Sequence, residues 1–405
     1  MKYRLAEIEL SNPLEPIRLE PDETGIGLAA RWNDRLVGFC MVECALGELI
    51  GIDRLRAIAD EHFAFGILNA KVAAELDTHA PLAGPLPSLT VAICTKDRAV
   101  RLGRLLDSLV AVKANSPFPH VDILVVDNAP SDETTREAAA RYGADYYREP
   151  KVGLNFARNS AINNARGAWI AYLDDDVVVD RGWLHGLAAA WRAAPGAGGF
   201  TGLVLPFRLD TEAQILFEER GGFGRGFLRR EFRSSSLRMP LHPVGAGIIG
   251  AGCNMAFDTA LVRSLGGFDD ALDTGAPLPG GGDLDICYRV LRSGRSMVYE
   301  PQYAVRHEHR ETIAQLRRQY WTWGLGMMAF LVKSWRHDPA CRPKQSAMVR
   351  WWVGDQLKAL GKAIVAREAR DIRFAWAEFS GGIQGLLGEY DRSLRRVATI
   401  RNAQS

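Results

Sequence analysis

Three adjacent aspartates, Asp174, Asp175 and Asp176, follow the apolar stretch AWIAYL at residues 168–173. The stretch has the composition of a buried parallel strand, and adjacent carboxylates at its end repel one another. A divalent cation removes that repulsion, and Mg²⁺ and Mn²⁺ bind carboxylate oxygens while bridging to substrate phosphates. An acidic helix N-terminus is the alternative, but it explains one or two aspartates better than three. The stretch therefore predicts a divalent-cation site for a phosphorylated substrate.

A second acidic pair follows three glycines in the stretch GGGDLDICYRVL at residues 280–291. Apolar residues at helical spacing predict a helix whose first turn carries Asp283 and Asp285. Asp283 is either a structural cap of that helix or a carboxylate that accepts a proton during a reaction.

The stretch VRHEHR at residues 305–310 places His307 and His309 two positions apart. On an extended segment such residues share one face. A lone histidine usually has a structural part, but a chain that needs a cation ligand makes His307 a candidate contact to metal or phosphate.

Predicted strands and helices alternate between residues 88 and 173. The strands are expected at 88–95, 121–127, 144–149 and 168–173, and the helices at 99–112, 132–142 and 154–166. This alternation indicates an α/β fold with a doubly wound, mostly parallel sheet. Ligands bind at the carboxyl ends of such strands. The polar motifs TKDR, DNAPSD and DDD follow three of these strands, so we expect them along one edge of the sheet.

Composition divides the chain into four parts. Residues 1–80 predict a small α+β domain with two strands around the turn WNDR and helical spacing afterwards, and its role is not indicated. Residues 81–88 are rich in proline and predict a linker. Residues 89–310 form the predicted α/β domain, and residues 311–405 a helical, basic region.

The C-terminal region combines an apolar stripe with positive charge. The stripe is formed by Ile313, Leu316, Tyr320, Trp323, Met327 and Phe330. It indicates either packing against the protein body or an interfacial membrane helix. Residues 301–405 carry 18 basic and 9 acidic side chains, a net charge of +9. Such charge suggests an acidic partner, such as a membrane surface, but no nucleic-acid recognition motif accompanies it.

Composition also limits the class of protein. The 405 residues are 47% hydrophobic and 24% charged, which is typical of soluble globular proteins. We find no signal-peptide pattern and no apolar stretch of the ~18–20 residues that span a bilayer. Six scattered cysteines form no CxxC pair and indicate reduced thiols. We therefore expect a cytoplasmic protein. Peripheral contact of that protein with the inner face of the membrane is a second prediction.

The order of the polar motifs resembles that of the family-2 glycosyltransferases with a GT-A fold. The motifs are TKDR, VVDNAPSDET, GLNFARN, LDDD, GAGCNM, GGFDD with GGGDLD, and VRHEHR, and they extend over about residues 88–310. Each motif is weak alone, but seven in this order are specific together.

The resemblance implies which residues contact the donor, a nucleoside-diphosphate sugar for which a UDP-sugar is favoured. The implied nucleotide contacts are Thr95, Asp97, Arg98, Asp127, Asn128, Asn155, Arg158 and Asn159. Asp174 or Asp175 would face the ribose or sugar. Asp176 would be the main ligand of Mn²⁺ or Mg²⁺, and Asp174 and His307 would be further ligands.

The resemblance also implies an inverting transfer. Asp283 resembles the catalytic base, and Asp285 its partner. The acceptor would be a hydroxyl of a glycan or lipid-linked molecule, in cell-surface polysaccharide or glycoconjugate synthesis. Two departures bear on acceptor recognition: Gly282 stands where the family often has Glu, and Asp258 where many members have Arg.

Two other readings remain open. A nucleotidyltransferase also places acidic metal ligands on a doubly wound sheet, but it usually has a glycine-rich loop where this chain has CTKDRAV. A non-catalytic scaffold of glycosyltransferase shape would be expected to lack Asp283 or the three aspartates, and this chain keeps both.

Overall fold

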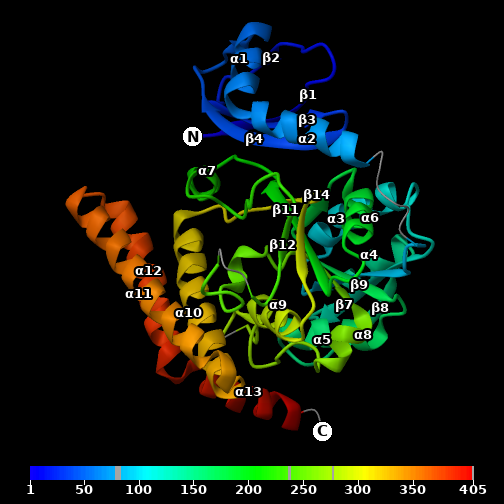
Figure 1. The fold of residues 1–405 in the computed structure, drawn as a ribbon, viewed down its shortest axis with the longest axis vertical. Helices are drawn as coiled ribbons and strands as arrows, with labels where there is room; N and C mark the ends of the chain where they lie inside the picture. Colours follow the sequence, from blue (N-terminus) through cyan, green and yellow to red (C-terminus); the bar gives the residue numbers. More distant parts are fainter. Residues whose placement is uncertain (78–83, 236–238, 276–277, 404–405) are drawn as a thin grey trace.

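A nine-stranded sheet forms the centre of the molecule in the computed structural model, which describes residues 1–77, 84–235, 239–275 and 278–403 (Figure 1). Its strands are β6 (Leu89–Thr95), β7 (Val121–Asn128), β8 (Asp145–Glu149), β9 (Trp169–Asp174), β10 (Val177–Val179), β11 (Gly199–Pro206), β12 (Arg230–Phe232), β13 (Asn254–Asp258) and β14 (Met297–His307). The strand order is β10-β14-β11-β13-β9-β6-β7-β8, and β12 pairs with β14. The strands β6 to β9, β11 and β14 run in one direction, whereas β10, β12 and β13 run in the other.

Helices cover both faces of this sheet, so the predicted α/β fold is confirmed. The helices are α3 (Ala99–Lys113), α4 (Thr134–Arg141), α5 (Leu154–Asn164), α6 (Trp183–Ala193), α7 (Glu212–Glu219), α8 (Thr259–Ser264) and α9 (Gly282–Arg292). The helices α3, α4 and α6 contribute to the core on one face, and α5, α8 and α9 to the core on the other. Every residue of β6 is buried, as expected for a parallel strand covered on two sides.

The segment after the three aspartates differs from the expectation. The alternative explanation of the aspartates places them at a helix N-terminus, but β10 lies between them and α6. Three consecutive valines favour an extended backbone, and β10 pairs antiparallel with β14, where Val177 lies opposite His307. This pairing brings the aspartates and the histidine motif together.

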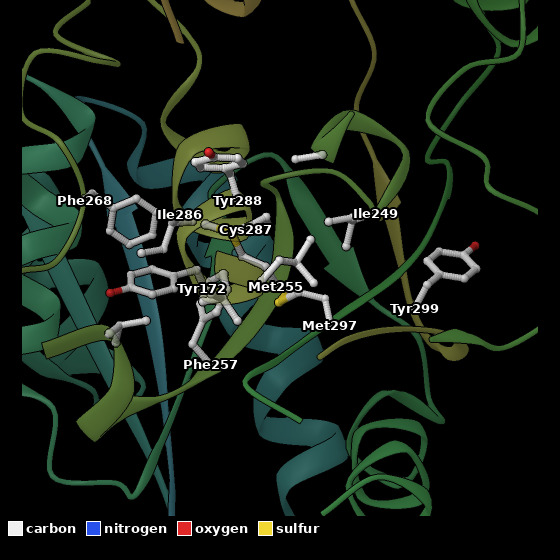
Figure 2. Packing of buried hydrophobic residues seen from close by; sticks show 14 of the residues in the cluster. Tyr172, Ile249, Met255, Phe257, Phe268, Ile286, Cys287, Tyr288, Met297 and Tyr299 are labelled. Carbon is white, nitrogen blue, oxygen red and sulfur yellow. The ribbon is translucent and has the colours of Figure 1, made fainter. Parts of the chain in front are cut away.

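The core between the sheet and α9 fixes the start of that helix (Figure 2). Tyr172 of β9 and Met255 of β13 lie beside Ile286 and Cys287 of α9, and all four side chains are buried. Burying such side chains stabilises the packing by roughly 1.5–3 kcal/mol each. The first turn of α9, which carries Asp283, is therefore held against the sheet.

The N-terminal region forms a separate small sheet that lies at one end of the central sheet (Figure 1). Its strands are β1 (Tyr3–Glu9), β3 (Gly25–Trp32) and β4 (Arg35–Glu43), and β2 (Ile17–Arg18) pairs with β5 (Leu49–Ile50). The two strands predicted around WNDR are confirmed as β3 and β4. The predicted helical segment forms two helices, α1 (Ile52–His62) and α2 (Ala64–Asp77), with the break at buried Phe63. Part of the predicted linker, residues 81–83, lies outside the described residues, and the domain boundary remains a prediction.

A buried arginine joins the N-terminal sheet to the central sheet. Arg31 of β3 is 2% exposed; its Nε donates to Glu7 Oε1 at 2.7 Å, and its Nη2 donates to Asp180 just after β10. The backbone of Leu36 exchanges two hydrogen bonds of 2.9 Å with the Gln302 side-chain amide of β14. The N-terminal sheet therefore contacts β14, which ends at His307, and the residue that follows β10, the short strand after the three aspartates.

Four helices form the C-terminal region and run along the side of the molecule (Figure 1). They are α10 (Ile313–His337), α11 (Arg342–Val365), α12 (Ala369–Gln384) and α13 (Tyr390–Asn402). Leu316, Tyr320 and Phe330 of the predicted stripe are buried, which supports packing for this part of it, whereas Trp323 is partly exposed. No described helix is both long and apolar enough to cross a membrane.

Candidate functional site

Three of the predicted site residues, Thr95, Asp127 and Asp174, lie at the carboxyl ends of β6, β7 and β9. Asp174 lies beside Cys94, and Thr95 lies opposite Asp127, in the parallel pairings of these strands. Because the strands end at one edge, the three polar motifs meet there, as the sequence analysis expects.

Asp175 is anchored beneath this edge by two of the predicted contacts. Its carboxylate accepts hydrogen bonds from Thr95 Oγ1 at 2.7 Å and from Arg98 Nη1 at 2.9 Å. Burial raises the pKa of Asp175, although the charge of Arg98 acts against that rise. Thr95 and Arg98 thus orient the aspartate cluster, and the half-exposed guanidinium of Arg98 still faces solvent.

Asp176 and His307 face one another across a narrow gap. Asp176 Oδ1 lies 3.4 Å from His307 Nε2, and both side chains are buried. Among the described residues, Asp176 Oδ1 has no hydrogen-bond partner. Burial raises the pKa of Asp176 and lowers that of His307 well below its ordinary value. A buried oxygen and a ring nitrogen left facing each other are donors suited to a cation.

Arg158 of α5 connects Asp174 to a second acidic group. Its Nη1 donates to Asn155 Oδ1 and to Asp273 Oδ2, each at 3.1 Å, and its Nη2 lies 3.9 Å from Asp174 Oδ1. Burial raises the pKa of Asp174 to about 7, although Arg158 acts to lower it. Burial also raises the pKa of Asp273 to about 6, although Arg158 acts to lower it. Arg158 is therefore the central cation of an acidic site.

Asp283 lies at the start of α9, close to this cation. A methyl group added at Gly252 would lie 3.2 Å from Asp283 Oδ2 and 3.4 Å from Arg158 Nη2. Asp283 Oδ1 accepts a hydrogen bond from the backbone of Leu284 at 2.9 Å. The side chain is only partly buried, and no ion pair involves it among the described residues. Its carboxylate is thus available to a bound molecule.

Asp285, the predicted partner of Asp283, is engaged elsewhere. The residue is 1% exposed, accepts from Arg289 Nε at 2.7 Å, and forms an ion pair with Lys333 of α10. Arg289 in turn donates to the backbone oxygens of Leu265 and Gly267. Through these contacts Asp285 ties α9 to α10 and to the preceding loop, and its role as partner of Asp283 remains a prediction.

The three predicted asparagines hold loops rather than present free amides. Asn128 donates to Lys151 O at 2.6 Å and accepts from Gly153 N at 2.9 Å. Asn155 donates to two backbone oxygens, and Asn159 both donates to and accepts from the Phe268 backbone. These contacts give all three a structural role, and their contact with a nucleotide remains a prediction.

The remaining predicted contacts, Asp97 and Asp127, differ in whether they keep an acceptor atom for a ligand. Asp97 accepts from the backbone and the hydroxyl of Ser131 at 2.8 and 2.9 Å. Asp127 accepts from the Tyr146 hydroxyl at 2.9 Å, but its Oδ1 has no partner among the described residues. Burial raises the pKa of Asp127. Asp127 therefore keeps an acceptor for a ligand, whereas Asp97 fixes a loop. Asp258, noted as a departure, caps α8 by accepting from Leu261 N.

Two acidic residues of the site are absent from the predictions. Asp273 binds Arg158 and also accepts from Gly282 N at 3.1 Å, so it links α5 to the start of α9. Glu308, inside the histidine motif, pairs with Arg101, Arg104 and Arg208, which hold the pKa of its carboxyl down at about 2. The acidic motif GGFDDALD could have indicated Asp273 as a site residue. No local pattern indicates that its partner is Arg158, 115 residues earlier.

The described residues contain no group of three or more His, Cys, Asp or Glu side chains arranged to hold a metal ion. Asp176 and His307 supply two donors, and the partly exposed Asp174 lies on the same edge. Mg²⁺ commonly takes one or two carboxylates and completes its shell with water and substrate phosphates. The residues present fit a cation whose remaining ligands come from a bound diphosphate.

Comparison with known proteins gives two family matches. The model described as Glycosyl transferase family 2 matches residues 90–229, and that of Glycosyl transferase family group 2 matches residues 169–366. Together these matches cover more than half of the chain and include every predicted site residue.

Individual relatives are more distant. The pre-mycofactocin glycosyltransferase of two Mycobacterium tuberculosis strains (CDC 1551 / Oshkosh and ATCC 25618 / H37Rv) is 23% identical over 316 residues. That alignment covers 74% of this chain and 61% of the relative, so the chain matches less than two thirds of the relative's length.

Two solved structures also align. The mannosyltransferase PcManGT of Pyrobaculum calidifontis, in complex with GDP-Man and Mn²⁺, has a TM-score of 0.48 at 16% identity, over 79% of this chain and 94% of that one. The mannosyl-3-phosphoglycerate synthase of Rubrobacter xylanophilus has a TM-score of 0.43 at 17% identity, over 62% of this chain and 75% of that one.

Proposed function

Because the chain belongs to glycosyltransferase family 2 and has its GT-A-type α/β fold, we propose a donor, a cation requirement and a stereochemical course for its glycosyl transfer. The donor is a nucleoside-diphosphate sugar, with a UDP-sugar favoured, and the acceptor is a hydroxyl of a glycan or lipid-linked molecule. The transfer inverts the anomeric carbon and serves cell-surface polysaccharide or glycoconjugate synthesis.

One observation carries the cation requirement: the unpartnered Asp176 Oδ1 lies 3.4 Å from His307 Nε2. Mn²⁺ or Mg²⁺ held there would neutralise the negative charge of the departing diphosphate. Asp175 cannot take that place, because Thr95 and Arg98 already bind its oxygens. Asp174, at the exposed end of the cluster, orients the sugar or ribose.

Asp283 is the proposed base. Its carboxylate accepts the proton of the acceptor hydroxyl, whose oxygen forms a bond to the anomeric carbon. The bond from that carbon to the diphosphate oxygen breaks, and its electron pair leaves with the nucleoside diphosphate. Attack from the face opposite the leaving group inverts the configuration. Arg158 lies between Asp174 and Asp283, and its positive charge favours the ionised form of Asp174.

Nucleotide binding measured by calorimetry tests the proposal. UDP, GDP, dTDP and CDP are titrated with and without Mn²⁺ into the wild type and into Asp176→Ala. We expect Mn²⁺-dependent binding of one nucleotide, weakened at least about 10-fold in Asp176→Ala because the protein loses its main cation ligand. Asp53→Ala, which changes an exposed aspartate of α1, is the matched control and should bind as the wild type does.

The other readings have distinct outcomes when nucleoside triphosphates are included in the titrations and turnover of the sugar nucleotides is assayed beside them. A non-catalytic scaffold would bind a nucleotide without turning over any sugar nucleotide. A nucleotidyltransferase would bind a nucleoside triphosphate in preference to the diphosphates. Equal binding by Asp176→Ala and the wild type would remove the three aspartates as the diphosphate site.

Exposed tryptophans support a second proposal, a peripheral contact of the C-terminal helices with an anionic membrane surface. Trp335, Trp351 and Trp376 are 42%, 54% and 57% exposed. Arg342 lies over the Trp335 ring, 5.6 Å from its centroid, and exposed Arg350 precedes Trp351. Indole rings settle at the headgroup level of a bilayer, and each nearby arginine adds about 1 kcal/mol of attraction to anionic lipid.

Vesicle co-sedimentation checks this contact. The wild type should bind vesicles of phosphatidylcholine with phosphatidylglycerol and bind those of phosphatidylcholine alone weakly, because the charge attraction is missing. Changing Trp335, Trp351 and Trp376 together to serine should weaken binding at least about 10-fold, since three apolar rings no longer enter the interface. Trp32→Ser, in the N-terminal sheet, is the control. Equal sedimentation with both vesicle types would contradict the contact.

A further inference from the structure

Two buried histidines and the partly buried Glu218 form a hydrogen-bonded chain behind the Asp176 site. Glu218 of α7 lies 2.7 Å from His309 Nε2 through its Oε1. His309 Nδ1 lies 3.1 Å from His307 Nδ1. The Nε2 of His307, at the other side of its ring, faces Asp176 Oδ1. The chain therefore runs from a carboxylate on α7 to the gap in which the proposed cation would bind.

We propose that Glu218 and His309 are positioning residues, which set the tautomer of His307 so that its Nε2 presents a lone pair to a divalent cation. The proposal rests on the cation site of the proposed function. Neither Glu218 nor His309 touches that cation; both act through His307.

Hydrogen-bond chemistry assigns each proton in the chain. A carboxylate only accepts, so His309 Nε2 carries the hydrogen toward Glu218. A neutral imidazole has a single N–H, so His309 Nδ1 is an acceptor. The hydrogen between the two Nδ1 atoms therefore belongs to His307, which leaves Nε2 of His307 without one. That nitrogen is then a ligand atom for a metal.

The gap at Asp176 agrees with this assignment. A hydrogen on His307 Nε2 would make a charge-assisted bond to the carboxylate of about 2.7–2.9 Å. The separation is 3.4 Å, and Asp176 Oδ1 accepts no hydrogen bond from any described residue. Two acceptor atoms held this close repel each other unless a cation lies between them.

Aromatic rings hold the two histidines in place. The Phe223 ring meets His307 edge to face with the centroids 5.1 Å apart, and the Phe217 ring meets His309 at 4.7 Å. These rings keep water away from the Nδ1–Nδ1 contact and prevent the imidazoles from turning. Outer residues that orient a metal-binding histidine typically change metal affinity by 10–100-fold.

The tautomer is tested first on the unaltered, metal-free protein. The ¹⁵N shifts and couplings of the histidine-labelled full chain distinguish an Nδ1–H from an Nε2–H imidazole, and His307→Gln assigns the signal. We expect His307 to carry its hydrogen on Nδ1. A hydrogen on Nε2 overturns the proposal. Because this measurement needs no metal, it is independent of whether the proposed function holds.

Metal affinity is tested second, by the electron paramagnetic resonance signal of free Mn²⁺ during titration with the nucleoside diphosphate that the calorimetry selects present, and with the same titration without protein subtracted. His309→Leu and Glu218→Leu should each weaken Mn²⁺ binding about 10–100-fold. His309→Asn, whose amide oxygen can accept from His307 Nδ1, should restore affinity to within about threefold of the wild type. Unchanged affinity in both leucine variants overturns the proposal. Absence of Mn²⁺ binding by the wild type would instead overturn the cation site of the proposed function.

Discussion

Replacing Asp283 with asparagine is expected to lower kcat about 10³-fold while donor binding stays close to that of the wild type. An amide cannot take the proton of the acceptor hydroxyl, and a general base typically contributes 10²–10⁴-fold to a rate. Asparagine keeps the shape of the side chain and can still accept from Leu284 N. The measurements are kcat with a sugar nucleotide that the calorimetry selects, and the affinity for its nucleoside diphosphate.

Asp285→Asn is the matched control, because it changes the carboxylate that lies two residues away in the first turn of the same helix. We expect this variant to unfold at a lower urea concentration, since Arg289 and Lys333 lose their shared partner. Its kcat should fall much less than that of Asp283→Asn. If Asp285→Asn loses kcat as severely while remaining folded, or if Asp283→Asn keeps its kcat, the assignment of the base is wrong.

Replacing Arg158 with methionine is expected to lower the free energy of unfolding by about 3–5 kcal/mol at neutral pH. Removing one partner of a buried ion pair leaves the other charges uncompensated. Arg158 is buried against the Phe268 ring, pairs with Asp273 at 3.1 Å, and lies 3.9 Å from Asp174. Urea denaturation of both proteins over a pH series measures the effect.

The pH dependence of this loss has a definite sign. In the wild type the pKa of Asp273 is raised to about 6 and that of Asp174 to about 7, so the folded state binds these protons more tightly than the unfolded chain. Ionising the two groups therefore lowers stability as pH rises through that range. Arg158 limits this loss, so its removal should matter most above pH 7 and progressively less below pH 6.

Arg98→Met serves as the comparison, because Arg98 also pairs with a buried aspartate but is half exposed. The space that Arg98 leaves is open to solvent, and Asp175 keeps its hydrogen bond from Thr95, so we expect a clearly smaller loss than for Arg158→Met. Equal losses for the two variants, or a loss for Arg158→Met that does not change with pH, would contradict the picture of Arg158 as the central buried cation.

The strands that build the site could be predicted from sequence because their apolar runs are uninterrupted. The stretch LTVAICT is buried at every position of β6, and no amphipathic helix shows such a run. Once the strands are ordered, the carboxyl ends of parallel neighbours must meet. The joint position of Thr95, Asp127 and Asp174 follows from that rule alone.

The partner that each individual side chain binds could not be predicted in the same way. Asp283 and Asp285 look equivalent in the sequence. Lys333, 48 positions after Asp285, binds Asp285 and does not bind Asp283. Asn155 resembles a ligand contact, yet its amide holds backbone oxygens more than a hundred positions away. Such partners are chosen by tertiary packing, for which the local pattern contains no signal.

The residues that could not be predicted from the sequence were missed for the same reason, because tertiary packing determines their contacts. Glu218 lies in a helix whose local pattern is ordinary, and its meeting with His309 depends on where α7 crosses the end of β14. The short strand β10 was hidden because three residues carry too little pattern to be distinguished from a helix entry. Its pairing with β14 makes this segment a strand rather than the start of a helix.

The attachment of the N-terminal sheet also bears on how the chain folds during its synthesis. Arg31 leaves the ribosome 149 residues before Asp180, and Leu36 leaves it 266 residues before Gln302. At about 5–20 residues per second, these intervals last about 7–30 s and about 13–50 s. For that time the face of the N-terminal sheet that later contacts β10 and β14 has no partner on its own chain. The N-terminal sheet is made before the central sheet, and it is thus among the last parts of this chain to find its final place.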